Sequence, residues 1–238
     1  MSEKCKWLHE VLEELSRVRY PFSLEMLPKN GIYFFYEDGE FWGHSSSKML
    51  RIVRIGTHRS DNFRNRIAEH FLLTERKMKF DANRPKPSDR SIFRKNIGRA
   101  LLNKDNDSYL KIWEIDFLPK RNREKYGRLR DIEKEKLVES KITEILRERF
   151  SFRFLIIEKE DERIGSKGLE SKLIATLAKC KECRPSENWL GRYSPIPEIR
   201  GFGLWLRQHL RAHGIERGDM EKIEILVQKT KEWIRKNW

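Results

Sequence analysis

The stretch Gly31-Ile-Tyr-Phe-Phe-Tyr36 decides the fold of this chain. Aromatic and β-branched residues favour the pleated surface of a strand, so this stretch predicts a β-strand. The pair Asp38-Gly39 that follows is typical of a tight hairpin turn, which would lead back into Phe41-Trp42. We therefore expect a β-hairpin at this point of the chain.

A second strand and a helix are predicted directly downstream. The serines at 45–47 indicate a loop, and the stretch Leu50–Ile55, which ends at Gly56, is again rich in β-branched residues. Apolar residues then recur at helical spacing over 63–71. The order is strand, strand, helix.

The remaining sequence contains further helical and strand patterns. A third convincing strand is predicted at 152–157, and 107–117 is a weaker strand candidate. The helical spacing of apolar residues recurs in six segments: 3–18, 91–102, 128–149, 169–177, 204–212 and 219–237. These patterns predict an α+β fold, with a small, mostly antiparallel three-stranded sheet flanked by helices.

A chain of 238 residues is long enough for one sizeable core but short for two full-sized domains. We interpret it as a single elaborated domain, 1–238. Its predicted parts are a helical lead-in (1–30), a core (31–74 and 150–191), a basic insertion (75–149) and a helical C-terminal extension (192–238).

The charge of the chain predicts a polyanionic partner. Lysine and arginine number 51 against 37 aspartates and glutamates, which gives a formal net charge of +14. Such a surface attracts nucleic acid. No apolar run approaches the roughly 20 residues of a membrane-spanning helix, and only three cysteines occur, so we expect no membrane association and a cytoplasmic location.

The motifs Gly31-Ile-Tyr33 and Arg54-Ile-Gly56 resemble the two strand motifs that name the GIY-YIG nucleases. Four further residues follow in the order that this family has: Arg66, His70, Glu170 and Asn188. Arg66 and His70 stand one helical turn apart and would share a cleft. Glu170 lies at the border of an apolar helix face, where a hard carboxylate can hold Mg²⁺.

The resemblance implies a metal-dependent endonuclease that hydrolyses double-stranded DNA. It places Tyr33 beside the attacking water, Arg66 at the scissile phosphate and Glu170 on a single Mg²⁺ or Mn²⁺ ion. His70 and Asn188 match two further catalytic positions of the family.

The second motif departs from the family, because Arg54 stands where its tyrosine would be. A guanidinium near Tyr33 would favour the phenolate, which could then act as the base. Alternatively, Arg54 binds phosphate and His70 is the base, since imidazole titrates near neutrality. We favour Tyr33 as the base.

The basic insertion supplies candidate DNA contacts: Arg84, Lys86, Arg90, Arg94, Lys95 and Arg99. Because the core carries such additions, we expect a site-specific restriction-type enzyme, which on a symmetric site would act as a homodimer. Repair and mobile-element nucleases share this core and are alternatives. A non-catalytic nucleic-acid-binding protein is another, and Arg54 is its best support.

Several histidines and cysteines lie outside the two motifs and could also bind a metal or the substrate. Cys180 and Cys183 together with His209 and His213 have spacings that suggest a zinc site, although small buried thiols also explain the cysteines. His44 and His58 lie in polar loop segments near the motifs, either as substrate contacts or as surface histidines.

Overall fold

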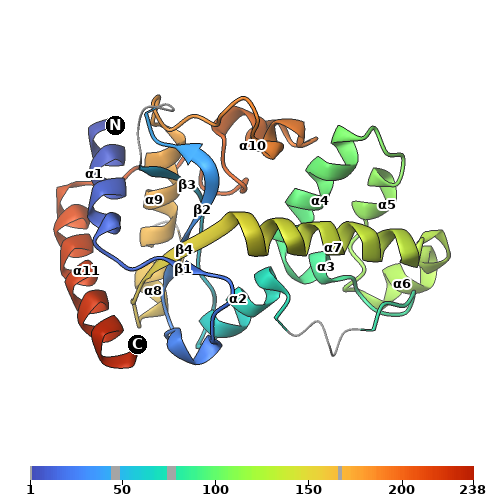
Figure 1. Ribbon diagram of the computed structural model, residues 1–238, viewed down its shortest axis with the longest axis horizontal. Helices are drawn as coiled ribbons and strands as arrows, with labels where there is room; N and C mark the ends of the chain where they lie inside the picture. The colour runs from blue at the N-terminus through green and yellow to red at the C-terminus, as the bar shows by residue number, and fades with distance from the viewer. Residues whose placement is uncertain (1, 44–48, 74–78, 166–167) are drawn as a thin grey trace.

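The computed structural model describes residues 2–43, 49–73, 79–165 and 168–238 (Figure 1). Its strands are β1 Val18–Arg19, β2 Ile32–Phe41, β3 Leu50–Gly56 and β4 Phe150–Leu155. Its α-helices are α1 Ser2–Glu13, α2 Phe63–Phe71, α3 Pro87–Arg90, α4 Ile92–Lys104, α5 Leu110–Trp113, α6 Lys120–Tyr126, α7 Ile132–Arg149, α8 Glu160–Arg163, α9 Leu169–Ala178, α10 Pro197–Phe202 and α11 Arg217–Asn237. Short 3-10 helices are η1 Leu24–Met26, η3 Gly127–Leu129 and η4 Leu190–Tyr193. The predicted α+β class is confirmed.

The sheet is antiparallel, in the order β1-β4-β2-β3, so the described residues give it four strands rather than the three predicted. Strand β2 is central because its residues 32–36 are buried on both faces, which is the environment that a continuous apolar run favours. Within it, Tyr33 pairs with Gly56 of β3 on one side and with Phe154 of β4 on the other.

The hairpin turn predicted at Asp38-Gly39 was wrong. Strand β2 continues through both residues to Phe41, which pairs with Leu50 of β3. The pairing of β2 with β3 shifts register between Tyr36 and Phe41, and Gly39 lies in this irregular stretch. Its φ of +85° is a backbone conformation that glycine adopts without strain. The predicted loop at 45–47 lies outside the described residues.

Helices cover both faces of the sheet. Figure 1 shows α1, α9 and α11 on one side, and contacts join α9 to β3 and α11 to β4. On the other side Phe35 packs against Phe71 of α2 and Phe93 of α4, with ring centroids 5.8 and 5.0 Å apart. An aromatic core thus packs strand β2, which carries the first motif, against helix α2.

Between α2 and β4 the described chain is helical and is organised along α7, which runs away from the sheet (Figure 1). The strand considered at 107–117 was wrong, because Leu110–Trp113 form helix α5. Trp113 is buried against α4, with its indole N–H donating to the Lys95 carbonyl at 3.1 Å. A Cβ on Gly98 would lie 2.3 Å from this indole, so Gly98 allows α5 to pack closely against α4. This packing favours a helix over the strand considered for 107–117.

The C-terminal region has one predicted helix and lacks the other. Helix α11 confirms the pattern at 219–237, but residues 204–212 form no helix. Instead the Trp205 N–H donates to the Val53 carbonyl of β3 at 2.8 Å. This segment therefore covers the edge of the sheet, which would otherwise leave backbone groups unpaired.

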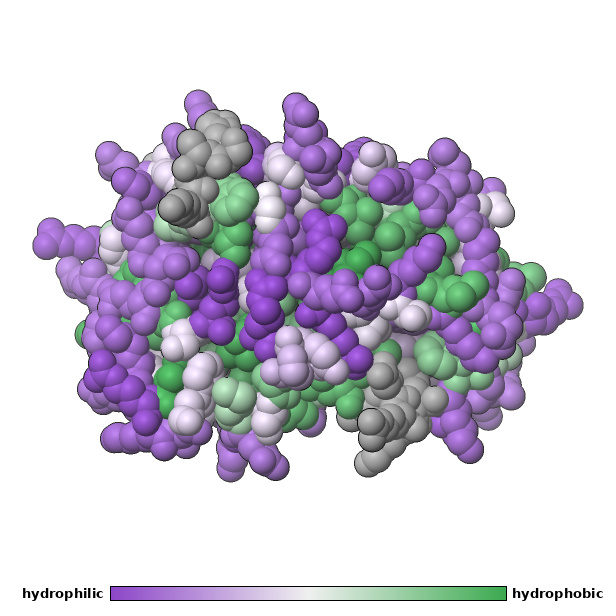
Figure 2. Space-filling view, in the orientation of Figure 1, coloured by the Kyte–Doolittle hydropathy of each residue, from purple (hydrophilic) through white to green (hydrophobic). Residues whose placement is uncertain are grey.

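Hydrophilic side chains cover most of the face seen in Figure 2, with hydrophobic side chains gathered in patches between them. This matches a sequence in which 37% of residues are charged.

Candidate active site

A cleft opens where β2, β3, α2 and α9 meet. It consists of two adjoining hollows of about 360 and 590 Å³. Both hollows are lined by the same five residues: Arg54, Arg66, Ile92, Glu170 and Gln208. Tyr33 lines the smaller hollow. The structure thus brings four predicted site residues, from elements far apart in sequence, to one cavity.

Tyr33 is held by its neighbours in one orientation. Its side chain is 1% exposed, and its hydroxyl lies 3.0 Å from Nε2 of His70. Its ring crosses above Gly56, where a Cβ would lie 2.4 Å from the hydroxyl oxygen. Glycine in the second motif therefore makes room for the tyrosine of the first.

His70 lies behind Tyr33 and does not line the cleft. It is fully buried, its Nδ1 lies 2.8 Å from the Ser91 hydroxyl, and its Nε2 faces Tyr33. Burial, together with the nearby charges of Arg66, Arg54 and Arg94, holds the pKa of His70 well below its usual value. A neutral imidazole with both nitrogens engaged orients the tyrosine hydroxyl, and it has no direct access to a water in the cleft.

Arg54 is a buried cation without a carboxylate partner among the described residues. It pairs with Phe35 across the strands and so lies on the same sheet face as Tyr33. Its guanidinium donates to the Trp205 carbonyl and stacks on Phe93 at 4.9 Å, while its Nε is buried without a hydrogen-bond partner. Burial lowers the pKa of Arg54, partly offset by Tyr33. An anion in the cleft would satisfy this charge.

Arg66 is more accessible and is held at the rim of the cleft. Its Nη1 donates to the Glu69 carboxylate and to the Arg90 carbonyl, both at 2.8 Å. Burial opposes the charge of Arg66, but attraction to Tyr33 and Glu69 outweighs it and raises the pKa of the guanidinium. Arg54 and Arg66 both interact electrostatically with Tyr33, so two permanent cations face the same part of the cleft as the tyrosine hydroxyl.

Glu170 projects from the first turn of α9 into both hollows. It is half-buried, and within the described residues it forms no ion pair. Burial raises its pKa, although Arg54 and a hydrogen bond from the Thr57 backbone favour the charged form. An incompletely neutralised carboxylate facing a cavity suits a hard divalent cation that completes its shell with water and substrate oxygens.

The described residues contain no group of three or more histidine, cysteine, aspartate or glutamate side chains placed to hold a metal. The zinc set considered above is divided: Cys180 and Cys183 are buried beside Cys5 of α1, whereas His209 lines the cleft. A metal bound at Glu170 would therefore rest on one protein carboxylate.

Asn188 is not brought into the cleft. It is exposed in the turn that precedes η4 and lines neither hollow.

Four of the six predicted DNA contacts are buried and paired with acidic side chains of the protein itself. The charged groups of Lys86 and Arg94 are fully buried in ion pairs with Asp89 and Glu139. Lys95 and Arg99 are 8% and 7% exposed and are also paired. Of the six, Arg84 and Arg90 are exposed. Acidic partners up to 45 residues away neutralise the four buried cations, so these charges are engaged within the protein.

Several residues outside the two motifs also shape or line the cleft. His58 is buried; its Nε2 accepts from the Gly31 N–H at 3.2 Å and from Arg163, so it fixes the loop after β3. His44 lies outside the described residues. Arg59 and Asn62 follow Gly56 directly and their polarity was a usable signal. Gln208 carried no sequence signal, because its position depends on the fold.

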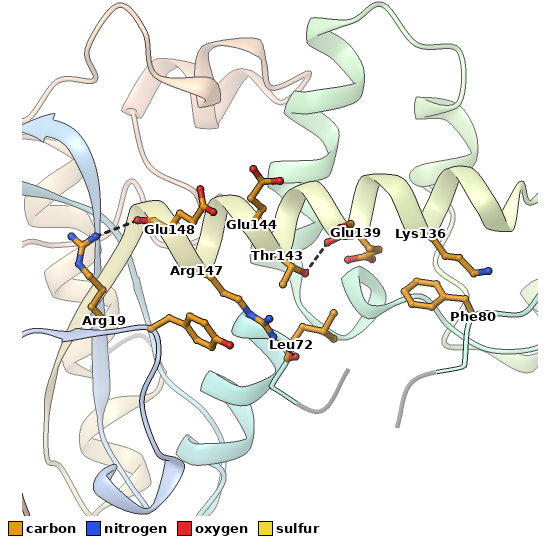
Figure 3. A pocket seen from close by; sticks show the side chains of 11 residues that line it. Arg19, Leu72, Phe80, Lys136, Glu139, Thr143, Glu144, Arg147 and Glu148 are labelled. Carbon is orange, nitrogen blue, oxygen red and sulfur yellow. Dashed lines mark hydrogen bonds between the residues drawn. The ribbon is translucent and has the colours of Figure 1, made fainter. Parts of the chain in front are cut away.

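A larger hollow of about 740 Å³ lies beneath α7 and contains none of the motif residues (Figure 3). Its basic side chains are balanced by acidic ones or held by other contacts. Arg19 pairs with Asp38, and Arg147 donates to the carbonyls of Phe71 and Leu72. Its charge balance gives it no preference for an anionic substrate.

Comparison with known proteins gives one match. The family model described as GIY-YIG domain matches residues 4–233. No curated protein and no solved structure matches the chain. Among the described helices, none is both long and apolar enough to cross a lipid bilayer.

Proposed function

The chain belongs to the GIY-YIG family of nuclease domains, and from this premise we propose that it is a divalent-metal-dependent endonuclease that hydrolyses phosphodiester bonds in double-stranded DNA. One observation carries the proposal: Tyr33, Arg54, Arg66 and Glu170 line one continuous cleft. A hydroxyl that can act as a base, cations that can stabilise phosphate charge and a carboxylate that can hold a metal ion together suit phosphodiester hydrolysis.

In the proposed mechanism a water attacks the phosphorus in line with the departing 3′ oxygen. Tyr33, acting as a phenolate beside Arg54 and Arg66, takes the proton of that water. His70 holds the tyrosine oxygen in place from behind. Arg54 and Arg66 neutralise the charge that grows on the phosphate oxygens. Mg²⁺ or Mn²⁺ on Glu170 would supply Lewis-acid stabilisation of the same charge. The departing 3′ oxygen takes a proton from solvent water, so the products carry a 3′ hydroxyl and a 5′ phosphate, and Tyr33 returns its proton to solvent.

The location of Arg54 favours this catalytic proposal over a non-catalytic DNA-binding protein. A residue that replaced tyrosine after loss of activity would need no defined place in the site. Arg54 instead lies buried beside Tyr33 with an unpartnered Nε.

The direct test is incubation of the purified chain with supercoiled plasmid in Mg²⁺, in Mn²⁺ and in EDTA. The proposal predicts nicked or linear DNA with either metal and intact plasmid in EDTA. Binding without cleavage in all three conditions would establish the non-catalytic alternative. Discrete fragments, as opposed to a smear, would support the restriction-type enzyme that we also propose.

We expect Arg54→Met to shift the pH dependence of cleavage. Removing a cation beside Tyr33 disfavours the phenolate, so the rising limb of the rate profile should move to higher pH, with activity partly recovered in alkaline buffer. The measurement is single-turnover cleavage from pH 6 to about 10.

Arg59→Met is the matched control, because Arg59 is exposed and lines the same cleft. It should weaken DNA binding while leaving the position of the limb unchanged. A uniform loss of rate in Arg54→Met at every pH would mean that Arg54 only binds phosphate.

A further inference from the structure

The segment 203–209, here called the edge segment, is attached to the strand that carries Arg54. Its Gly203 carbonyl accepts from Arg51 at 2.6 Å, and its Trp205 N–H donates to Val53 at 2.8 Å. The Trp205 carbonyl accepts from Arg54 itself. The position of the edge segment relative to the cleft is therefore set by β3.

Buried side chains anchor the edge segment on both sides of a short projecting stretch. Trp205 is fully buried, donates its indole N–H to Glu37 at 3.1 Å and packs on Trp189 at 5.0 Å. Leu206 and Leu210 are buried as well. Residues 207–209 between these anchors are thus held out over the cleft.

Arg207, Gln208 and His209 all line the 590 Å³ hollow of the cleft, and Gln208 also lines the adjoining hollow that contains Tyr33. Arg207 and Gln208 are exposed, and His209 is half-buried. Within the part of the chain that the structure describes, none of the three side chains forms a hydrogen bond or an ion pair. Their polar groups are available to a bound molecule, unlike the paired cations of the insertion.

The backbone at His209 is in the left-handed region, with a φ of +62°. A residue with a Cβ adopts this conformation less readily than glycine does. The turn is closed by the Ala212 N–H, which donates to the His209 carbonyl at 3.1 Å. Glycine would relieve the strain, so the side chain at this position is consistent with a functional contact.

The chemistry of the three side chains favours base edges over phosphates. Arginine pairs with guanine and glutamine with adenine through two hydrogen bonds in the major groove. Position separates the two roles: Arg54 and Arg66 line the hollow that contains Tyr33 and are placed for the reacting phosphate, whereas Arg207 and His209 line only the adjoining hollow.

We propose that Arg207, Gln208 and His209 form a reading loop that contacts base edges next to the bond that is cut and so sets the sequence preference of the enzyme. This inference rests on the proposed nuclease function and assigns base recognition to the edge segment, which replaces the insertion in that role.

The test uses a pool of duplexes with random sequence. In one arm the pool is cleaved in Mg²⁺ and the new ends are sequenced. In the other, duplexes retained by the protein in EDTA are sequenced. The variants are Gln208→Ala and Arg207→Ala, with Arg211→Ala as control, because Arg211 is exposed nearby and does not line the cleft.

The wild type should prefer particular bases within a few positions of the cut. Gln208→Ala should reduce the preference at one position by about tenfold, while its rate on non-preferred DNA changes less than about threefold. Arg211→Ala should keep the wild-type preference.

Cleavage without base preference, or an unchanged preference in Gln208→Ala and Arg207→Ala, would overturn the reading loop and leave the nuclease proposal standing. A slower rate on all sequences alike would identify phosphate contacts and also overturn it. Selective retention in EDTA that Gln208→Ala abolishes, without any cleavage, would support the loop and overturn the nuclease proposal.

Discussion

Replacing Glu170 with glutamine should abolish DNA cleavage, with a loss of at least about a thousandfold in the single-turnover rate, or about 4 kcal/mol in the barrier. Glutamine keeps the size of the side chain and can still accept a hydrogen bond from the Thr57 backbone, but it carries no charge for a divalent cation. DNA binding should change by less than about twofold, because a carboxylate makes no favourable contact with phosphate.

Thermal unfolding separates this chemical effect from misfolding. Burial already disfavours the charged carboxylate of Glu170, so a neutral side chain should leave the protein as stable or more stable. Glu198→Gln is the matched control, because Glu198 also lines the 590 Å³ hollow of the cleft but is exposed. Retained cleavage in Glu170→Gln would remove this residue from the mechanism, and an equal loss in Glu198→Gln would show a general effect of charge.

For Arg66→Met we expect a loss of about a hundredfold to a thousandfold in the cleavage rate. A permanent cation at the rim of a cleft stabilises the charge of the transition state more than that of bound DNA. Binding should weaken modestly, and the slope of binding affinity against salt concentration should fall by about one unit.

The control is Arg64→Met on the same helix. Arg64 donates to the backbone carbonyls of Leu27 and Glu25 and does not line the cleft. Its loss should lower the melting temperature with little effect on the rate of the folded protein. Normal cleavage by Arg66→Met would show that another cation of the same hollow, such as Arg54 or Arg59, serves the reacting phosphate.

The parts of the fold that the sequence predicted well depend on local patterns. The strand at 31–36 and the helix at 63–71 carry their apolar spacing within a few residues, so β2 and α2 formed as expected. Because both elements contribute to one aromatic core, the relation of Tyr33 to His70 follows from two local predictions joined by packing.

The features that the sequence did not predict depend on contacts between distant segments. Arg94 lies in a basic stretch that suggested DNA contacts, but its guanidinium binds Glu139, which lies 45 residues later. Leu204, Trp205 and Leu206 have apolar character that suggested a helix, yet their backbone is used at the edge of β3. Neither outcome has a signal within its own stretch of sequence.

The site shows the same division. The resemblance to the family's motifs was enough to predict Tyr33, Arg66 and Glu170. The reading-loop residues line the cleft because Trp205 is hydrogen-bonded to Val53 of β3 and to Arg54, which no local pattern in the sequence indicates. Arg54 lies between the two cases: its place in the motif was visible, and its unpartnered Nε was not.

The central claim is that this cleft hydrolyses DNA with water. The most direct measurement is single-turnover cleavage in ¹⁸O-labelled water with Mg²⁺, followed by mass analysis of the products. The account predicts one ¹⁸O atom on each new 5′ phosphate, an unlabelled 3′ hydroxyl, and no product from Glu170→Gln. Unlabelled 5′ phosphates, or cleavage that proceeds equally well in the Glu170 variant, would contradict it.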